Sequence, residues 1–259
     1  MSETANKTAD APIMRIEGLR KSFGGVTATD DVSVEIHTGE THAIIGPNGA
    51  GKTTLISQLS GLLPPDAGRV TFRGRDITRL PAHQRAHVGL ARSFQITSVF
   101  MEMTVLDNVA LAVQARSGHS FHFWSKARTL SHLREPAYAK LEQVSLAGRA
   151  HTRASALSHG ERRQLEVAMA LGTEPHMLLL DEPMAGMGTE ESARMIEMLR
   201  GMQGTTMLLV EHDMDAVFAL ADRISVLVYG RLIATGTPDE IRGNEEVIKA
   251  YLGEGDAES

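Results

Sequence analysis

The stretch Gly46-Pro-Asn-Gly-Ala-Gly-Lys-Thr-Thr54 decides the fold of this chain, because it matches the phosphate-binding pattern G-x-x-x-x-G-K-[ST] in full. Glycines let the backbone take positive φ and approach an anion closely. The N–H groups of such a loop form a nest at the start of a helix. Lys52 can then reach the β- and γ-phosphates, and the Thr53 hydroxyl can complete a Mg²⁺ shell. We expect a nucleoside-triphosphate site formed by Gly46, Pro47, Asn48, Gly49, Ala50, Gly51, Lys52, Thr53 and Thr54.

The segments on either side of this loop support the prediction. Thr41–Ile45 is typical of a short buried strand, and residues 53–63 carry apolar side chains at helical spacing. A strand that enters a glycine-rich loop and continues into a helix is the setting that the pattern requires. A chance match in a glycine-rich turn is therefore the weaker interpretation.

The composition narrows the class of protein. The chain has 259 residues, of which 42% are hydrophobic and 22% charged, as in soluble globular proteins. It has no cysteine, which excludes disulfides and thiolate metal sites. No apolar run approaches the length of a membrane span. The net charge is −6 and no basic stripe appears, so we expect no nucleic-acid partner.

The remaining pattern predicts an α/β fold. Strands are expected at 13–19, 31–36, 69–74, 177–180, 205–210, 224–228 and 231–234. Helices are expected at 81–88, 103–116, 130–148, 162–172, 189–200, 215–221 and 245–252. Strands that alternate with helices indicate a mostly parallel sheet. We expect one domain over 13–252 with an inserted helical subdomain at about 96–157, a disordered tail at 1–12 and an acidic tail at 253–259.

Two adjacent carboxylates follow the apolar strand 177–180. Asp181 and Glu182 would be costly to bury, but ligands of open α/β sheets gather at the carboxyl ends of strands. Beside a Mg²⁺–phosphate group, one acid can serve the metal and the other can orient a water. We expect this pair to take part in hydrolysis; a solvated strand end with no chemical role is the weaker alternative.

Three further features leave alternatives open. Phe23, in the expected turn Lys21-Ser-Phe-Gly-Gly25, can cap a small core or stack on an adenine. Ser158, with Glu161 three residues later, is a helix cap that can also form an anion site together with Gly160. The aromatic and histidine residues of 117–128 can form a buried cluster or an exposed docking patch.

The order of these motifs resembles the ATP-binding subunits of ATP-binding-cassette (ABC) transporters, from about residue 13 to residue 252. The resemblance rests on the phosphate loop, Gln95, the signature Leu-Ser-His-Gly-Glu161, Leu-Asp-Glu182 and His212. The signature differs from the commonest form, Leu-Ser-Gly-Gly-Gln, at His159 and Glu161. The segments Gly-Leu-Ala-Arg-Ser-Phe-Gln95, Met-Thr-Val-Leu-Asp-Asn108, Glu-Pro-Met-Ala-Gly-Met187 and Ala-Tyr-Leu-Gly253 are similar to the branch that serves branched-chain amino-acid importers.

The resemblance implies a P-loop ATPase core with an N-terminal antiparallel β subdomain, and it implies roles for single residues. Phe23 would stack on adenine. Thr53, Gln95 and Asp181 would hold Mg²⁺, while Lys52 binds the phosphates. Glu182 would act as general base or orient the water, and His212 would contact the γ-phosphate. Ser158 and Gly160 would bind the ATP of a partner subunit. Where many relatives carry Asp after the Glu182 loop, this chain has Gly188, so the cross-dimer contact of that Asp is in doubt.

The resemblance also implies partners. A second ATPase subunit, either identical or a sister protein, would complete the nucleotide site. Two membrane permease subunits would be driven by ATP hydrolysis, and a periplasmic or surface binding protein would deliver the substrate to them. The chain would lie at the cytoplasmic face of the cell membrane. Related urea and amide importers and a lipopolysaccharide exporter cassette remain alternatives. A soluble ABC ATPase of DNA repair or translation would need a coiled-coil insert, a second cassette or a basic surface, and the sequence shows none of these. A non-hydrolysing binding module would not need Glu182 and His212, so their presence argues against that alternative.

Overall fold

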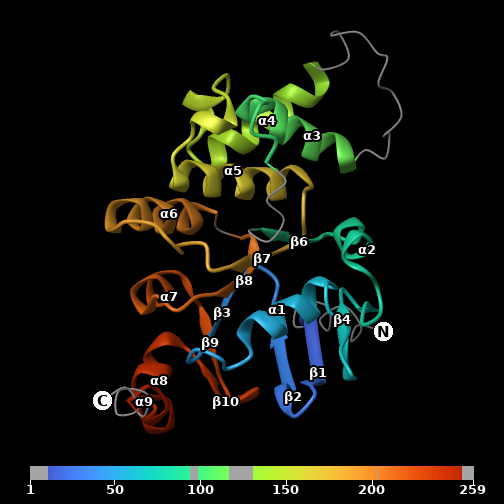
Figure 1. The fold of residues 1–259 in the computed structure, drawn as a ribbon, viewed down its shortest axis with the longest axis vertical. Coiled ribbons are helices and arrows are strands. Elements are labelled where there is room, and N and C mark those ends of the chain that lie inside the picture. The colour runs from blue at the N-terminus through green and yellow to red at the C-terminus, as the bar shows by residue number, and fades with distance from the viewer. Residues whose placement is uncertain (1–10, 94–98, 117–130, 203, 253–259) are drawn as a thin grey trace, which may run out of the picture. The chain divides into compact units, whose positions relative to one another are not determined.

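The computed structural model describes residues 11–93, 99–116, 131–202 and 204–252 (Figure 1). The chain divides into two compact units, one from Met1–Arg85 and Gly204–Ser259, the other from Ala86–Gln203. The phosphate-binding loop and His212 belong to the first unit, and Ser158, Asp181 and Glu182 belong to the second. Gln95 and the 117–128 cluster lie outside the described residues.

An antiparallel sheet forms one part of the first unit. It contains β1 (Met14–Phe23), β2 (Val26–Ile36), β4 (Ala67–Phe72) and β5 (Arg75–Asp76), in the order β2-β1-β4-β5. Met14, Ile16 and Leu19 of β1 are buried and alternate with exposed neighbours near the start of the strand. One face of the sheet therefore covers a core, as expected for an antiparallel sheet.

The first hairpin is longer than the sequence predicts. We expected strands at 13–19 and 31–36 joined through a turn at Lys21–Gly25, whereas the structure pairs Ser22 with Thr27 and Phe23 with Val26. Only Gly24 and Gly25 remain between the strands. The turn prediction was wrong for residues 21–23, because pairing across the hairpin extends both strands beyond their apolar segments.

A mostly parallel sheet carries the phosphate-binding loop. β3 (Thr41–Ile45) lies between β8 (Thr206–Val210) and β9 (Arg223–Val228), and it is parallel to both. Every residue of β3 and β8 is buried, which explains why these strands read as apolar runs. β10 (Arg231–Gly236) pairs antiparallel with β9 across Tyr229 and Gly230, which confirms the predicted hairpin.

Helix α1 (Lys52–Ser60) follows the loop and packs on β2 and β8. It ends before the predicted residue 63, because Gly61 adopts a left-handed φ of 79° and its N–H bonds back to Gln58 O. The described part of this unit also contains α7 (Met214–Leu220), α8 (Pro238–Arg242) and α9 (Glu245–Leu252). The sequence analysis did not predict α8, although Thr237 and Glu240 form a capping box there.

The second unit combines two parallel strands with a group of helices. β6 (Leu90–Ser93) pairs with β7 (Met177–Asp181). Helices α3 (Val105–Arg116), α4 (Ser131–Gln143) and α5 (His159–Gly172) pack on one another, and α6 (Thr189–Gly201) contacts α5. Helix α2 (Ala82–His87) comes before β6 in the chain, and its residues up to Arg85 belong to the first unit. None of the described helices has the length and apolar character needed to cross a bilayer.

Candidate nucleotide site

The phosphate-binding loop requires glycine at two positions where other backbone comes very close. Gly46 has φ of 153° and Gly51 has φ of 104°. A Cβ atom on Gly46 would lie 2.0 Å from the carbonyl oxygen of Leu227, and one on Gly51 would lie 2.0 Å from that of Ala28. No side chain fits at these distances. The loop is therefore held between the β2 and β9 backbones, and its own backbone sets the shape of the site.

Lys52 begins α1, and its side chain is buried within the loop. Its ammonium group donates hydrogen bonds to the carbonyl oxygens of Gly46 and Pro47, the second at 2.9 Å. Gly51, the N-cap residue, provides no side-chain cap, so the first amides of α1 are open to an anion. Thr53 is exposed on the first turn, as are Asn48 and Gly49 in the loop. This arrangement suits a phosphate chain that binds from the solvent side.

His212 leaves the sheet at the same edge as the phosphate-binding loop. β3 and β8 are parallel neighbours with Ile44 opposite Val210, so both chains leave the sheet at their carboxyl ends. The His212 side chain is 60% exposed. The buried Glu211 carboxylate accepts from the backbone N–H of His212 at 3.0 Å and so shapes this turn. The structure thus places His212, the predicted γ-phosphate contact, just beyond the end of β8, the strand next to the one that leads into the loop.

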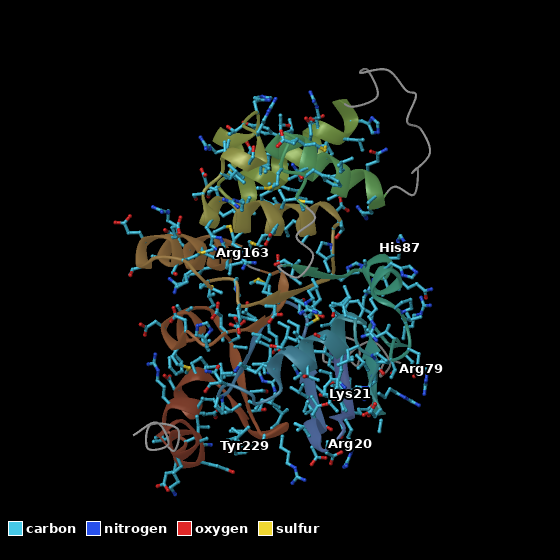
Figure 2. The ribbon with its side chains drawn as sticks, in the orientation of Figure 1. Arg20, Lys21, Arg79, His87, Arg163 and Tyr229 are labelled. Carbon is cyan, nitrogen blue, oxygen red and sulfur yellow. The ribbon has the colours of Figure 1, made fainter. Side chains whose placement is uncertain are left out.

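Phe23 lies at the tip of the first hairpin and is 51% exposed. That exposure argues against the interpretation in which its ring caps a small core. Lys21 belongs to the same strand, β1 (Figure 2). Its ammonium lies 5.7 Å from the Phe23 ring centroid and forms an ion pair with Asp66 at 2.7 Å. An exposed ring with a cation beside it can take a flat aromatic partner on its other face.

Asp181 and Glu182 stand at the carboxyl end of β7, as predicted. Asp181 Oδ2 accepts a hydrogen bond from Arg92 Nη2 at 2.7 Å. Burial lowers the pKa of Arg92, and the hydrogen bond and charge of Asp181 partly offset this shift. Glu182 has φ of 49°, a conformation that non-glycine residues rarely adopt and that occurs frequently at functional sites.

Ser158 caps α5, which confirms the predicted capping box. Its hydroxyl accepts from Glu161 N–H at 3.2 Å, and the Glu161 carboxylate accepts from Ser158 N–H at 2.8 Å. The same hydroxyl lies 3.4 Å from Glu191 Oε1, and a Cβ on Gly160 would lie 3.1 Å from that oxygen. A carboxylate therefore faces the helix N-terminus at which we expect an anion to bind.

The sequence analysis missed two of these partners, Arg92 and Glu191. Arg92 could have been suspected, because a charged residue within a short apolar strand needs a partner. Glu191 gave no such signal, since acidic residues are common in the first turn of a helix such as α6. Its approach to Gly160 depends on how two separate helices pack.

The donor chemistry fits a magnesium ion. The Thr53 hydroxyl and the Asp181 carboxylate are hard oxygen ligands, and Mg²⁺ is normally held by one or two such groups together with phosphates and waters. In the described ranges, no three His, Cys, Asp or Glu residues lie close enough to hold a metal without other ligands.

Two family models together match most of the chain. The model for the ABC transporter family matches residues 29–185, and that for the branched-chain amino acid ATP-binding cassette transporter matches residues 231–257. The chain is 41% identical to the high-affinity branched-chain amino acid transport ATP-binding protein LivG of Salmonella typhimurium, covering 94% of this chain and 98% of LivG. It is 39% identical to BraF of Pseudomonas aeruginosa, over 94% of this chain and 98% of BraF, and BraF bears the same description.

More distant relatives share the fold. The lipopolysaccharide export ATP-binding protein LptB of Haemophilus influenzae is 34% identical over 93% of this chain and 98% of LptB. Among solved structures, an ATP-binding cassette of an ABC transporter in its ADP conformation is 33% identical, with a TM-score of 0.81 over 93% of this chain and 99% of that structure. A nucleotide-free cassette reaches a TM-score of 0.79 at 31% identity, over 93% of this chain and 98% of the other.

Proposed function

Because this chain belongs to the ABC transporter family, we propose that it is the ATPase subunit of an importer for branched-chain amino acids. The observation that carries the ATPase function is the sheet edge shared by the phosphate-binding loop and His212. The substrate class rests on the match over residues 231–257 and on the similarity to LivG and BraF. The family model that matches residues 231–257 and the relatives LivG and BraF are all described by branched-chain amino acid transport.

Each site residue takes one task in this proposal. Lys52 and the loop amides bind the phosphates, and Phe23 stacks on the adenine. Thr53, Gln95 and Asp181 hold Mg²⁺, which when bound neutralises charge on the phosphates. Glu182 orients the attacking water, and His212 contacts the γ-phosphate.

A second ATPase subunit completes the site in this proposal. Ser158 and Gly160 of one subunit bind the γ-phosphate held by its partner, at the N-terminus of α5. Gly188 has no side chain and cannot supply the contact that an aspartate makes there in many relatives. Coupling between the two sites must therefore use other groups in this chain.

The partners on the membrane side are two permease subunits, and a binding protein delivers substrate to them. Phe100 and Met101 of the second unit are exposed at 52% and 37%, which is consistent with a surface that packs against another protein. They follow Gln95 closely in the chain. We place the subunit at the cytoplasmic face of the membrane, as the task of an import ATPase requires.

Reconstitution tests the proposal. Proteoliposomes that contain this chain and the permeases encoded beside its gene should accumulate labelled leucine when MgATP is supplied on the ATPase side. The Glu182→Gln variant should bind MgATP but lose at least ~100-fold in turnover and in uptake, the scale expected for loss of a general base. Hydrolysis with uptake of urea or an amide and no branched-chain amino acid would overturn the substrate class. Export of lipopolysaccharide would identify the complex as an exporter.

A further inference from the structure

Arg92 and Asp181 form an ion pair between neighbouring strands of the second unit. The two side chains are 8% and 11% exposed, and Nη2 lies 2.7 Å from Oδ2. Arg92 lies opposite Leu179 in the parallel register of β6 and β7, and Asp181 is two residues further along β7. Side chains two residues apart share a face of a strand, so this pairing follows from the register.

The pair is unusual because its acid is the residue to which the proposed function assigns Mg²⁺. A largely buried carboxylate is costly without a positive partner, and Arg92 provides one in the absence of metal. A divalent ion at Asp181 would have to share this carboxylate with a guanidinium. Two cations close to one carboxylate repel each other, and burial strengthens that repulsion.

We propose that Arg92 is a positioning residue that acts as a resident counter-cation of Asp181 and competes with the nucleotide-associated divalent ion for that carboxylate. Arg92 holds Oδ2, keeps the side chain oriented and lowers the affinity of the site for metal. Metal then binds well only together with the phosphates, whose negative charge outweighs the guanidinium. This inference rests on the proposed metal role of Asp181.

Two substitutions separate the charge of Arg92 from its hydrogen bonding. Arg92→Gln removes the charge and keeps an N–H donor, whereas Arg92→Lys keeps the charge and loses the planar guanidinium. The probe is Mn²⁺, titrated by electron paramagnetic resonance into protein saturated with ADP, so that no turnover is required. We expect Arg92→Gln to bind Mn²⁺ on the order of tenfold more tightly than wild type, because a repelling charge is gone. Arg92→Lys should stay within about twofold, since that charge remains.

Asp181→Asn distinguishes this inference from the function on which it rests. If Asp181 is a metal ligand, Asp181→Asn weakens Mn²⁺ binding, and Arg92→Gln in the Asp181→Asn background no longer tightens it. Unchanged Mn²⁺ affinity in Asp181→Asn would overturn the metal role itself. Weaker Mn²⁺ binding in Asp181→Asn, without tighter Mn²⁺ binding in Arg92→Gln, would overturn only the proposed competition between Arg92 and the metal. Equal weakening in both Arg92 variants would also overturn it, because Arg92 would then only support the site.

The wild-type protein gives a second measurement if Arg92→Gln does not fold. Arg92→Lys identifies the Nε–H resonance of Arg92 in a ¹⁵N-labelled sample, because that resonance disappears in the variant. Addition of Mg²⁺ to the ADP complex should shift the Arg92 resonance, since the carboxylate it contacts changes partner. A resonance unmoved at saturating Mg²⁺ would overturn the proposal.

Discussion

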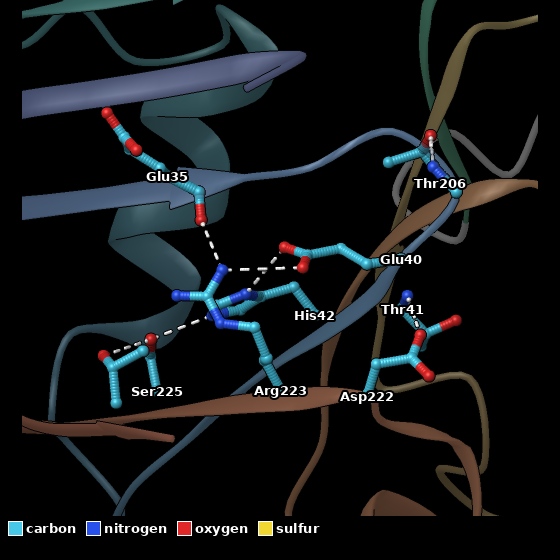
Figure 3. Close-up of polar contacts among 10 residues, drawn as sticks. Glu35, Glu40, Thr41, His42, Thr206, Asp222, Arg223 and Ser225 are labelled. Atoms are coloured by element: carbon cyan, nitrogen blue, oxygen red, sulfur yellow. Dashed lines mark hydrogen bonds and ion pairs between the residues drawn. The ribbon is translucent and has the colours of Figure 1, made fainter. Parts of the chain in front are cut away.

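His42 Nε2 lies 2.8 Å from Ser225 Oγ, and this contact joins β3 to β9 near the start of β3, the strand that leads into the phosphate-binding loop (Figure 3). The other ring nitrogen, Nδ1, lies 3.2 Å from Glu40 Oε1, and Ser225 Oγ lies 2.7 Å from Thr235 Oγ1. The His42 side chain is fully buried. A buried network of paired polar groups favours one register between these strands.

Glu40 makes this network sensitive to acid. Burial alone would raise the pKa of Glu40, but hydrogen bonds with His42 and His37 and the charges of His42 and Arg223 outweigh it and lower that pKa below its ordinary value. A carboxylate with a lowered folded-state pKa contributes stability above its unfolded-state pKa and loses it as the pH falls through the folded-state value. In urea unfolding at a series of pH values, the free energy of unfolding of Glu40→Gln should therefore fall less below about pH 4.5 than that of wild type. Glu17→Gln, exposed on β1, is the control. Parallel curves for Glu40→Gln and wild type would contradict this prediction.

Gly51→Ala tests whether close backbone contact shapes the phosphate-binding loop. The added Cβ would lie 2.0 Å from Ala28 O at a φ of 104°, so the loop must move. We expect ATP binding to be lost and the free energy of unfolding to fall by about 3 kcal/mol, from overpacking and backbone strain. Calorimetric titration with ATP and urea unfolding measure both effects. Gly25→Ala is the matched control, because a Cβ there meets nothing within 4 Å. Normal ATP affinity in Gly51→Ala would mean that the loop tolerates a side chain at this position.

Phe23→Ala tests the exposed ring at the hairpin tip. A stacked adenine makes the same contact before and in the transition state, so its loss should raise KM for ATP and leave kcat almost unchanged. We expect a rise of about tenfold, which corresponds to a typical base–aromatic contact. Phe23→Tyr should change KM little. The ring is half exposed, so stability should be nearly unaffected in all variants. An unchanged KM in Phe23→Ala would assign the ring to another partner.

The local parts of this structure could be predicted from the sequence. The loop between β3 and α1, the cap at Ser158 and the carboxylates after β7 each depend on a few consecutive residues, whose chemistry is specific enough to identify. The hairpin at Tyr229 and Gly230 could likewise be predicted from a few consecutive residues. Residue patterns over such short distances determine backbone conformation directly.

The features that could not be predicted from the sequence depend on pairing between distant segments. Arg92 and Asp181 meet because β6 and β7 adopt one register, and no short pattern specifies that register. Residues 21–23 extend β1 only because residues 26–29 lie opposite them. The buried position of His42 likewise follows from its neighbours on β9 and could not be recognised from a single histidine in an apolar strand.

The last prediction concerns the site that two subunits would share. Lys52→Ala damages the phosphate-binding loop, and Ser158→Asp places a negative charge where we propose that the partner's γ-phosphate binds. Aspartate is a good N-cap residue, so Ser158→Asp should keep α5 capped. Its carboxylate would also lie close to Glu191 Oε1, so urea unfolding of the variant must first show that the protein stays folded. Each variant alone should be nearly inactive, because both composite sites of its homodimer contain a defect. A mixed dimer has one site with both defects and one site with none. Equal amounts should restore about a quarter of the wild-type sites if subunits exchange freely and the sites act independently.

Turnover and trapped nucleotide per dimer should both be measured, because strict coupling between sites would hide the recovery in turnover alone. Exchange between subunits is verified with two differently tagged preparations. Normal activity in Ser158→Asp alone would mean that Ser158 acts only as a helix cap. An inactive mixture with proven exchange and no trapped nucleotide would mean that Ser158 serves its own subunit. Weak self-association of the wild-type chain would instead point to a sister ATPase as the partner, and the same pair of variants should then be divided between the two different subunits.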